Sequence, residues 1–159
     1  MKRHTAVLAL SAVSLLIPAG AAHAQQGYGS GLNLELARKC IAAAEAEAKK
    51  NSWAMAISIV DDGGHLMAFA RMDDTQIASV RISIMKARAA NNFKRPTKVF
   101  QDRAATDVAV LGLPGAITSE GGLPLVVNGK IIGAVGSSGG TSAQDGQVSK
   151  ACAENIGKL

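Results

Sequence analysis

The residues that could do chemistry in this chain are few and lie far apart in the sequence. His65 follows the turn-forming segment 61–64, and the other two histidines, His4 and His23, fall in a predicted N-terminal signal. One histidine in the mature chain excludes a multi-histidine metal site within it, and the sequence has no CxxC, HExxH or EF-hand motif. His65 therefore has two interpretations: a hydrogen-bonded turn residue or a ligand.

A carboxylate beside two glycines is the second candidate. Glu120, Gly121 and Gly122 interrupt an apolar segment, where a buried carboxylate costs free energy unless it is paired or functional. Missing side chains let a ligand approach the backbone. Glu120 is therefore a candidate general base, with an exposed bulge as the structural alternative.

Cations complete the candidate site. Arg71 and His65 lie an even number of residues apart on the predicted strand 65–71, so alternation places them on one face. Lys86 is embedded among apolar positions of the predicted helix 76–92. Cations and a carboxylate in one cleft are typical of an anion site with a proton-transfer group. The sequence thus predicts one pocket lined by His65, Arg71, Lys86, Glu120, Gly121 and Gly122.

The elements that must position these residues alternate between helices and strands. Tight turns at 61–64 and at Asn128-Gly129 predict antiparallel hairpins, and segregated helices then indicate an α+β fold. Ser142 is a possible N-cap of the last helix. The predicted order is helix 34–50, strands 54–60 and 65–71, helix 76–92, a short helix at 99–106, strand pieces 117–119 and 123–127, strand 130–137 and helix 143–156.

The helix 76–92 is apolar around most of its circumference. Such a helix must be buried on more than one side, and a domain of this size has few other elements that could bury it. The sequence therefore predicts a homo-oligomer with this helix at or near an interface.

The N-terminus has the three parts of a secretory signal. Residues 1–4 are basic, 5–17 are apolar, and Ala22-His23-Ala24 is a cleavage signature. Thirteen apolar residues are too few to span a bilayer, so we expect cleavage after Ala24, no stable membrane anchor, a flexible leader at 25–31 and a domain at 32–159. Loss of Lys2 and Arg3 lowers the formal charge from +5 to +3. That mild charge, with scattered aromatics, argues against nucleic-acid binding.

The two cysteines fall on the first and last predicted helices. In the oxidising periplasm or outside the cell, Cys40 and Cys152 could form a disulfide. Two small buried core residues are the alternative, because their separation cannot be derived from the sequence.

Several motifs occur together in a fixed order. They are VDDGGHL at 60–66, RMD at 71–73, KAR at 86–88, RPT at 95–97, EGGLP at 120–124, GAVGSSG at 133–139 and SAQDGQV at 142–148. In this order they resemble the GlcG-like family, also called the haem-degrading or HbpS-like domain. The resemblance covers residues 32–159.

The resemblance implies a profilin-like fold, with a five-stranded antiparallel sheet and helices on both faces, and oligomers that are often octamers. Its functions are mixed: extracellular haem binding and slow degradation with redox sensing, a domain fused to corrinoid adenosyltransferases, and a protein of glycolate operons. Such a fold does not by itself specify a function.

Three functions therefore stay open. The first is a periplasmic binding protein for haem or a related anionic ligand, with His65 as the one imidazole available to iron and cations for the propionates. The second is an enzyme that acts on a small carboxylate, with Glu120 as general base. The third is a structural partner of a membrane sensor.

Overall fold

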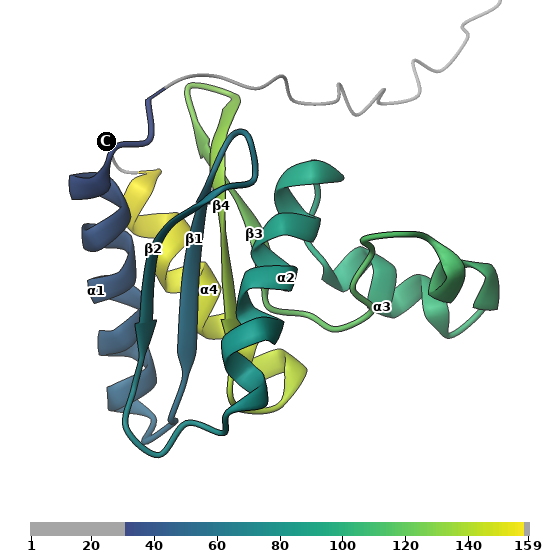
Figure 1. Cartoon of the computed structure of the whole chain (residues 1–159), viewed down its shortest axis with the longest axis horizontal. Helices are drawn as coiled ribbons and strands as arrows, with labels where there is room; N and C mark the ends of the chain where they lie inside the picture. Colours follow the sequence, from purple (N-terminus) through teal and green to yellow (C-terminus); the bar gives the residue numbers. More distant parts are fainter. Residues whose placement is uncertain (1–30, 158–159) are drawn as a thin grey trace, which may run out of the picture.

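An antiparallel sheet with helices on both faces forms the body of the computed structural model, which describes residues 31–157 (Figure 1). Within these residues the sheet has four strands in the order β2-β1-β4-β3. The strands are β1 (Ala56–Asp61), β2 (Leu66–Arg71), β3 (Gly122–Val127) and β4 (Lys130–Ser138). The α+β fold with helices on both faces is confirmed, but the fifth strand is not found, because residues 117–119 form no strand.

The two predicted hairpins are both present. Asn128 and Gly129 have φ values of 49° and 73°, the left-handed conformation that a two-residue hairpin turn needs. They join β3 to β4. The other turn joins β1 to β2, and a bulge between Ile59 and Val60 shifts the register next to it.

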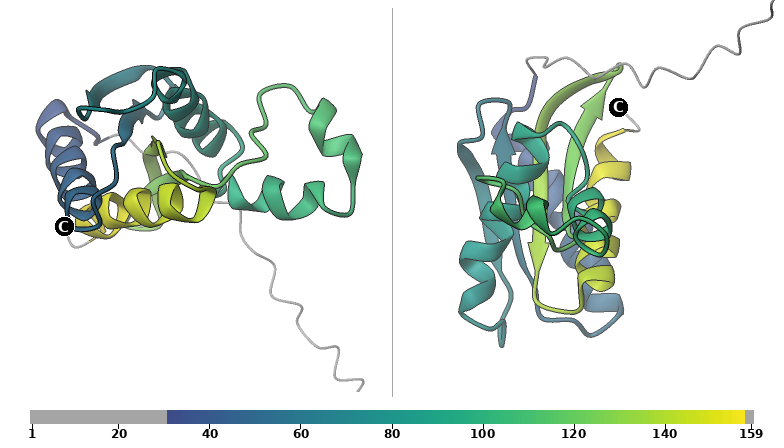
Figure 2. Two further views of the ribbon diagram at one scale, coloured as in Figure 1. Left: turned by 90° about the horizontal axis from the view of Figure 1, so that it is seen from below. Right: turned by 90° about the vertical axis from the view of Figure 1, so that its right-hand side faces the viewer.

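Two helices cover one face of the sheet and a third covers the other (Figure 2). Helices α1 (Leu34–Lys50) and α4 (Ser142–Ile156) pack side by side over the main core, which takes Ile57 and Ile59 from β1. Helix α2 (Ala78–Asn92) lies on the opposite face, over a small cluster formed with Val60 and Ala134.

Helix α2 approaches the sheet through small side chains. A Cβ atom added to Gly136 would overlap the backbone of Ser83 and Ala87 on α2, and Ser58 and Ser83 share a buried hydrogen bond of 2.7 Å between their hydroxyl oxygens. Larger apolar side chains face outward, among them Ile77 (79% exposed) and Met85 (43%). The apolar circumference predicted for this helix is therefore only partly covered by the described chain.

Side chains cap the N-termini of α1 and α4. Asn33 caps α1 through a hydrogen bond from the Leu36 N–H to its side chain. At α4 the cap is Thr141 and not Ser142, since the Thr141 backbone is extended and its hydroxyl and Gln144 form a capping box. Helix α4 therefore begins one residue earlier than expected.

Helix α3 (Lys98–Ala104) and the short 3-10 helix η1 (Val108–Gly112) project sideways from the sheet and its covering helices (Figure 1). This arm carries exposed apolar side chains, namely Val99, Val108, Leu111 and Leu113. Apolar groups gathered on a projecting segment are typical of a surface that another molecule covers.

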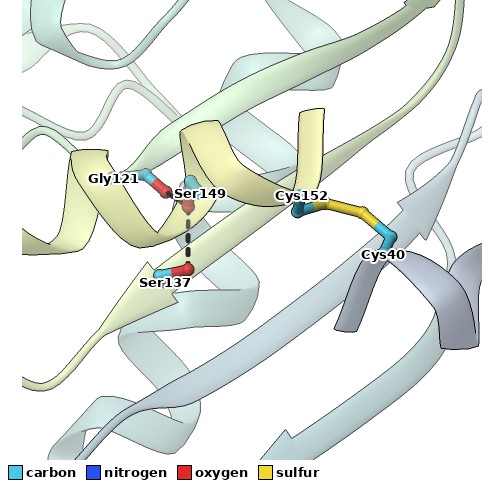
Figure 3. The surroundings of a disulfide bond; sticks show 5 residues. All are labelled: Cys40, Gly121, Ser137, Ser149 and Cys152. Carbon is cyan, nitrogen blue, oxygen red and sulfur yellow. Dashed lines mark hydrogen bonds between the residues drawn. A yellow bond between two sulfur atoms is a disulfide. The ribbon is translucent and has the colours of Figure 1, made fainter. Parts of the chain in front are cut away.

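Cys40 of α1 and Cys152 of α4 form a disulfide in this structure (Figure 3). Their Cα atoms are 4.4 Å apart and both residues are fully buried. Of the two alternatives left open by the sequence, the structure has the bridge. The predicted signal and most of the leader lie outside the described residues. Among residues 31–157, no helix has the length and apolar character needed to cross a membrane.

Candidate functional site

Lys86 and Asp145 form a buried ion pair that joins α2 to α4. Lys86 Nζ lies 2.6 Å from Asp145 Oδ2, and the two side chains are 1% and 4% exposed. The second carboxylate oxygen, Oδ1, accepts a hydrogen bond of 3.0 Å from the Gly140 N–H. Both oxygens of the carboxylate are thus satisfied, as a buried charge requires.

Burial raises the pKa of the Asp145 carboxyl above its ordinary value, and the hydrogen bond and positive charge of Lys86 oppose that rise. The backbone N–H groups of Gly139 and Gly140 oppose it to a smaller extent. The ionised form of Asp145 therefore depends on Lys86 more than on any other group.

Two of the predicted glycines pack directly on this pair. A Cβ atom at Gly121 would come within 2.9 Å of Lys86 Nζ, and one at Gly122 would overlap the Lys86 backbone. Gly121 also has a φ of 126°, which side-chain-bearing residues rarely adopt. Only glycine at these two positions therefore lets the backbone at the start of β3 lie so close to the buried Lys86.

A short chain of hydroxyl groups fixes the same loop from the other side (Figure 3). The Ser149 hydroxyl of α4 donates to the Gly121 carbonyl oxygen at 2.7 Å and lies 2.8 Å from the Ser137 hydroxyl of β4. These bonds hold the loop against both α4 and the sheet.

Glu120 precedes Gly121 in the chain and lies against the N-terminal part of α4. Its backbone N–H donates to the Gln101 side chain at 2.8 Å, and its carboxylate lies over Gly146, where any Cβ would overlap it. The side chain is half-buried and makes no hydrogen bond within residues 31–157. The pKa of nearby Lys98 is raised, chiefly by its hydrogen bond to Asp102 and in smaller part by the charge of Glu120.

His65 lies elsewhere, on the turn between β1 and β2, and its side chain is 82% exposed. Asp61 Oδ1 accepts the backbone N–H of His65 at 2.8 Å and lies 3.3 Å from the imidazole Nδ1. Gly63 leaves room for the ring, because a Cβ there would come within 2.8 Å of it. The Asp61 contact orients Nδ1 toward Asp61, and Nε2 makes no hydrogen bond within residues 31–157.

Helix α2 holds this turn in place. Asn91 donates to the Asp62 carbonyl oxygen at 3.0 Å, and Arg88 Nε donates to the Gly64 carbonyl oxygen at 3.1 Å. An exposed imidazole on a turn fastened by two side chains is better ordered than a histidine on a free loop.

Arg71 lies at the far end of β2, where it lines a pocket of about 290 Å³ together with Glu45, Lys49, Met72 and Asp73. The six residues predicted to share one pocket therefore lie in three places. Strand β2 begins at Leu66, one residue after His65, and six residues of strand span roughly 20 Å, so His65 and Arg71 lie near opposite ends of β2. Lys86 packs on Gly121 and Gly122, the two residues that follow Glu120.

Asp145 and Asp61 are the site residues that the sequence did not indicate. Asp145 lies 59 residues from Lys86, and no local pattern distinguishes it from the other acids. A buried lysine requires a buried acid, so the embedded position of Lys86 was the one available signal. Asp61 was recognised only as a turn residue.

Comparison with known proteins decides the family. The family described as "Haem degrading protein HbpS-like" matches residues 32–154. The chain belongs to this HbpS-like family.

Individual relatives agree with that assignment. Protein GlcG of Escherichia coli (strain K12) is 45% identical over 108 residues, which are 67% of this chain and 81% of GlcG. The crystal structure of Klebsiella pneumoniae protein ORFY has a TM-score of 0.77 at 31% identity, over 85% of this chain and 97% of that one. The PduOC:haem complex has a TM-score of 0.71 at 25% identity, over 79% and 95%. The sequence resemblance to the GlcG-like and HbpS-like proteins is thereby confirmed.

Proposed function

We propose that this HbpS-like protein is a periplasmic haem-binding protein in which His65 Nε2 ligates the iron. The observation that carries the proposal is the position of Asp61, whose Oδ1 accepts the His65 backbone N–H and lies 3.3 Å from the ring nitrogen Nδ1. Histidines that bind metals usually donate their other ring N–H to a carboxylate or carbonyl, which fixes the ring and its tautomer. The family and the haem complex of the related PduOC support haem as the ligand.

Apolar surface for a porphyrin lies beside His65. Leu66 and Phe69 are 44% and 38% exposed. They pair with Val60 and Ser58 of β1, so they lie on the α2 side of the sheet, yet α2 packs mainly on β1, β3 and β4. The α2-side face of β2 is therefore an apolar surface that no helix of the described chain covers.

A cation for the haem propionates is also close. Arg88 is exposed and uses Nε to bind the Gly64 carbonyl oxygen, which leaves its terminal amino groups for a carboxylate. Arg81 lies two helical turns earlier on the same side of α2 and is exposed. These arginines take the role that the sequence suggested for Arg71 and Lys86, because Lys86 is committed to Asp145. Bound haem would supply the redox chemistry of its iron.

Titration of the mature chain, residues 25–159, with hemin tests this proposal. His65→Ala should weaken binding by about tenfold or more and shift the Soret band. Asp62→Asn, an exposed change on the same turn, should do neither. Unchanged binding and an unchanged spectrum in His65→Ala would refute His65 as the ligand.

A second candidate function follows from Glu120. Its half-buried carboxylate has no hydrogen bond within the described residues, so it is available to accept a proton from a small carboxylate substrate, as a general base does. Under this alternative, Glu120→Gln abolishes a pH-dependent turnover of small hydroxy acids, whereas His65→Ala leaves it intact. Turnover that survives Glu120→Gln would exclude the alternative.

A further inference from the structure

We propose that the pocket at the end of β2 binds a small zwitterion, that is, a compound with one ammonium and one carboxylate such as an α-amino acid. This site is independent of the haem proposal. The pocket is lined by Glu45, Lys49, Arg71, Met72 and Asp73 and has a volume of about 290 Å³. That is just below the range for drug-sized ligand sites, roughly 300–1,000 Å³, and it fits a ligand of a few heavy atoms.

Two walls of the pocket carry its charged side chains. Helix α1 contributes Glu45 and Lys49, one turn apart, and the end of β2 and the turn after it contribute Arg71 and Asp73. Each wall thus carries one acid and one base, and the lining as a whole has no net charge. A simple anion would meet two carboxylates there and a simple cation two bases, whereas a zwitterion satisfies both signs.

The charged groups are available to a ligand. Lys49 and Glu45 are only loosely paired, with 3.9 Å between Nζ and Oε2. Arg71 and Asp73 make no ion pair or side-chain hydrogen bond to any other residue of the 31–157 segment. Two opposite charges that face one pocket without pairing leave both free to bind a ligand of complementary charges.

The backbone that carries Arg71, Met72 and Asp73 is held by hydrogen bonds. Met72 N–H donates to the Met55 carbonyl oxygen at 2.9 Å and so extends the pairing of β1 and β2. The buried Thr75 donates its hydroxyl to the Met72 carbonyl oxygen at 2.7 Å, which closes the turn that carries Asp73. A preformed site loses little ordering entropy on binding.

The fold also gives the ligand an orientation. The pocket lies at the C-terminal end of α1, where the helix dipole favours positive charge. The ligand ammonium therefore lies toward Glu45 and this helix end, and the ligand carboxylate lies on Arg71, whose planar guanidinium suits bidentate binding. Met72 offers an apolar contact for the carbon atoms between them.

Three matched compounds test the proposal on the oxidised mature protein without haem: L-alanine, propionate, which lacks the ammonium, and ethylamine, which lacks the carboxylate. In amide-resolved NMR titrations, L-alanine should bind with millimolar or tighter affinity and shift the signals of 45–49 and 71–73. Propionate and ethylamine should each bind at least about tenfold more weakly. No shift with L-alanine, or equal binding of propionate, would overturn the proposal.

Variants connect the binding to the named residues. Arg71→Met and Asp73→Asn are surface changes, and each should weaken L-alanine binding by about tenfold. Arg38→Met, an exposed change on α1 outside the pocket, should have no effect. Undiminished binding in both pocket variants would also overturn the assignment. Hemin plays no part in these titrations, so their outcome is separate from that of the haem proposal.

Discussion

The ammonium of Lys86 lies 2.6 Å from the carboxylate of Asp145, and neither side chain is more than 4% exposed. The pair links the centre of α2 to the first turn of α4, past the edge of the sheet where β3 begins. Gly121 and Gly122 pack directly against Lys86. Loss of either partner leaves the other as an uncompensated buried charge.

We therefore predict that Lys86→Met lowers the free energy of unfolding by about 3–5 kcal/mol at neutral pH. Urea denaturation measures this loss. Lys98→Met, which breaks an exposed pair with Asp102, is the matched control and should change stability very little. An equally small loss in Lys86→Met would show that the buried pair does not support the fold.

The same variant should have a characteristic pH dependence. Burial raises the pKa of Asp145 and Lys86 opposes the rise, so Lys86→Met raises it further. A carboxyl whose pKa is higher in the folded state stabilises the fold fully below its unfolded pKa and loses that contribution as pH rises through the folded pKa. The difference in the free energy of unfolding between wild type and Lys86→Met should thus be greatest at neutral pH and should shrink as pH falls toward 4. A deficit that grows on acidification would contradict this account.

The Cys40–Cys152 bridge spans 112 residues, so it restricts most of the unfolded chain. Its removal by Cys40→Ala with Cys152→Ala should cost about 2–5 kcal/mol of stability. Thiol labelling of the denatured, unreduced wild-type protein should find no free thiol. Two labelled thiols per chain would show that the bridge does not form.

Assembly is a further prediction, because four apolar side chains are exposed: Ile77 just before α2, Met85 on α2, and Val108 and Leu111 on the projecting arm. We expect a homo-oligomer that buries them. Light scattering should give a mass well above one chain, and Val108→Asp with Leu111→Asp should reduce it. A wild-type monomer at micromolar concentration would contradict the prediction.

Export is predicted from residues that the structure does not describe. Cleavage after Ala24 should give a periplasmic protein that begins at Gln25, which intact mass spectrometry of the periplasmic fraction measures. A protein that retains residues 1–24 would argue against secretion.

The local features of the fold could be predicted because they depend on neighbouring residues. The Asn128-Gly129 turn and the Asn33 cap each need only a few side chains in sequence, and the antiparallel pairing follows from the turns. The number of strands did not follow, since residues 117–119 have strand-like composition but lie in the connection between the arm and β3.

The site was predicted in part for the same reason. Lys86, Gly121 and Gly122 each carried a local signal, an embedded charge or a missing side chain, and they do meet. Alternation predicted that His65 and Arg71 share one face of a strand, but β2 begins at Leu66, so His65 lies on the turn and the length of β2 separates it from Arg71. Asp145 had no local signal, because its partner lies 59 residues away.

The most direct test of the haem proposal uses the fact that His65 is the one histidine of residues 25–159. Mature protein labelled with ¹⁵N only at histidine and loaded with hemin carries that label at a single side chain. The account predicts that the label changes the nitrogen hyperfine coupling of the haem iron, as measured by pulsed electron paramagnetic resonance, and that His65→Ala removes the coupling. A coupling that is identical with and without the label would show that His65 does not bind the iron.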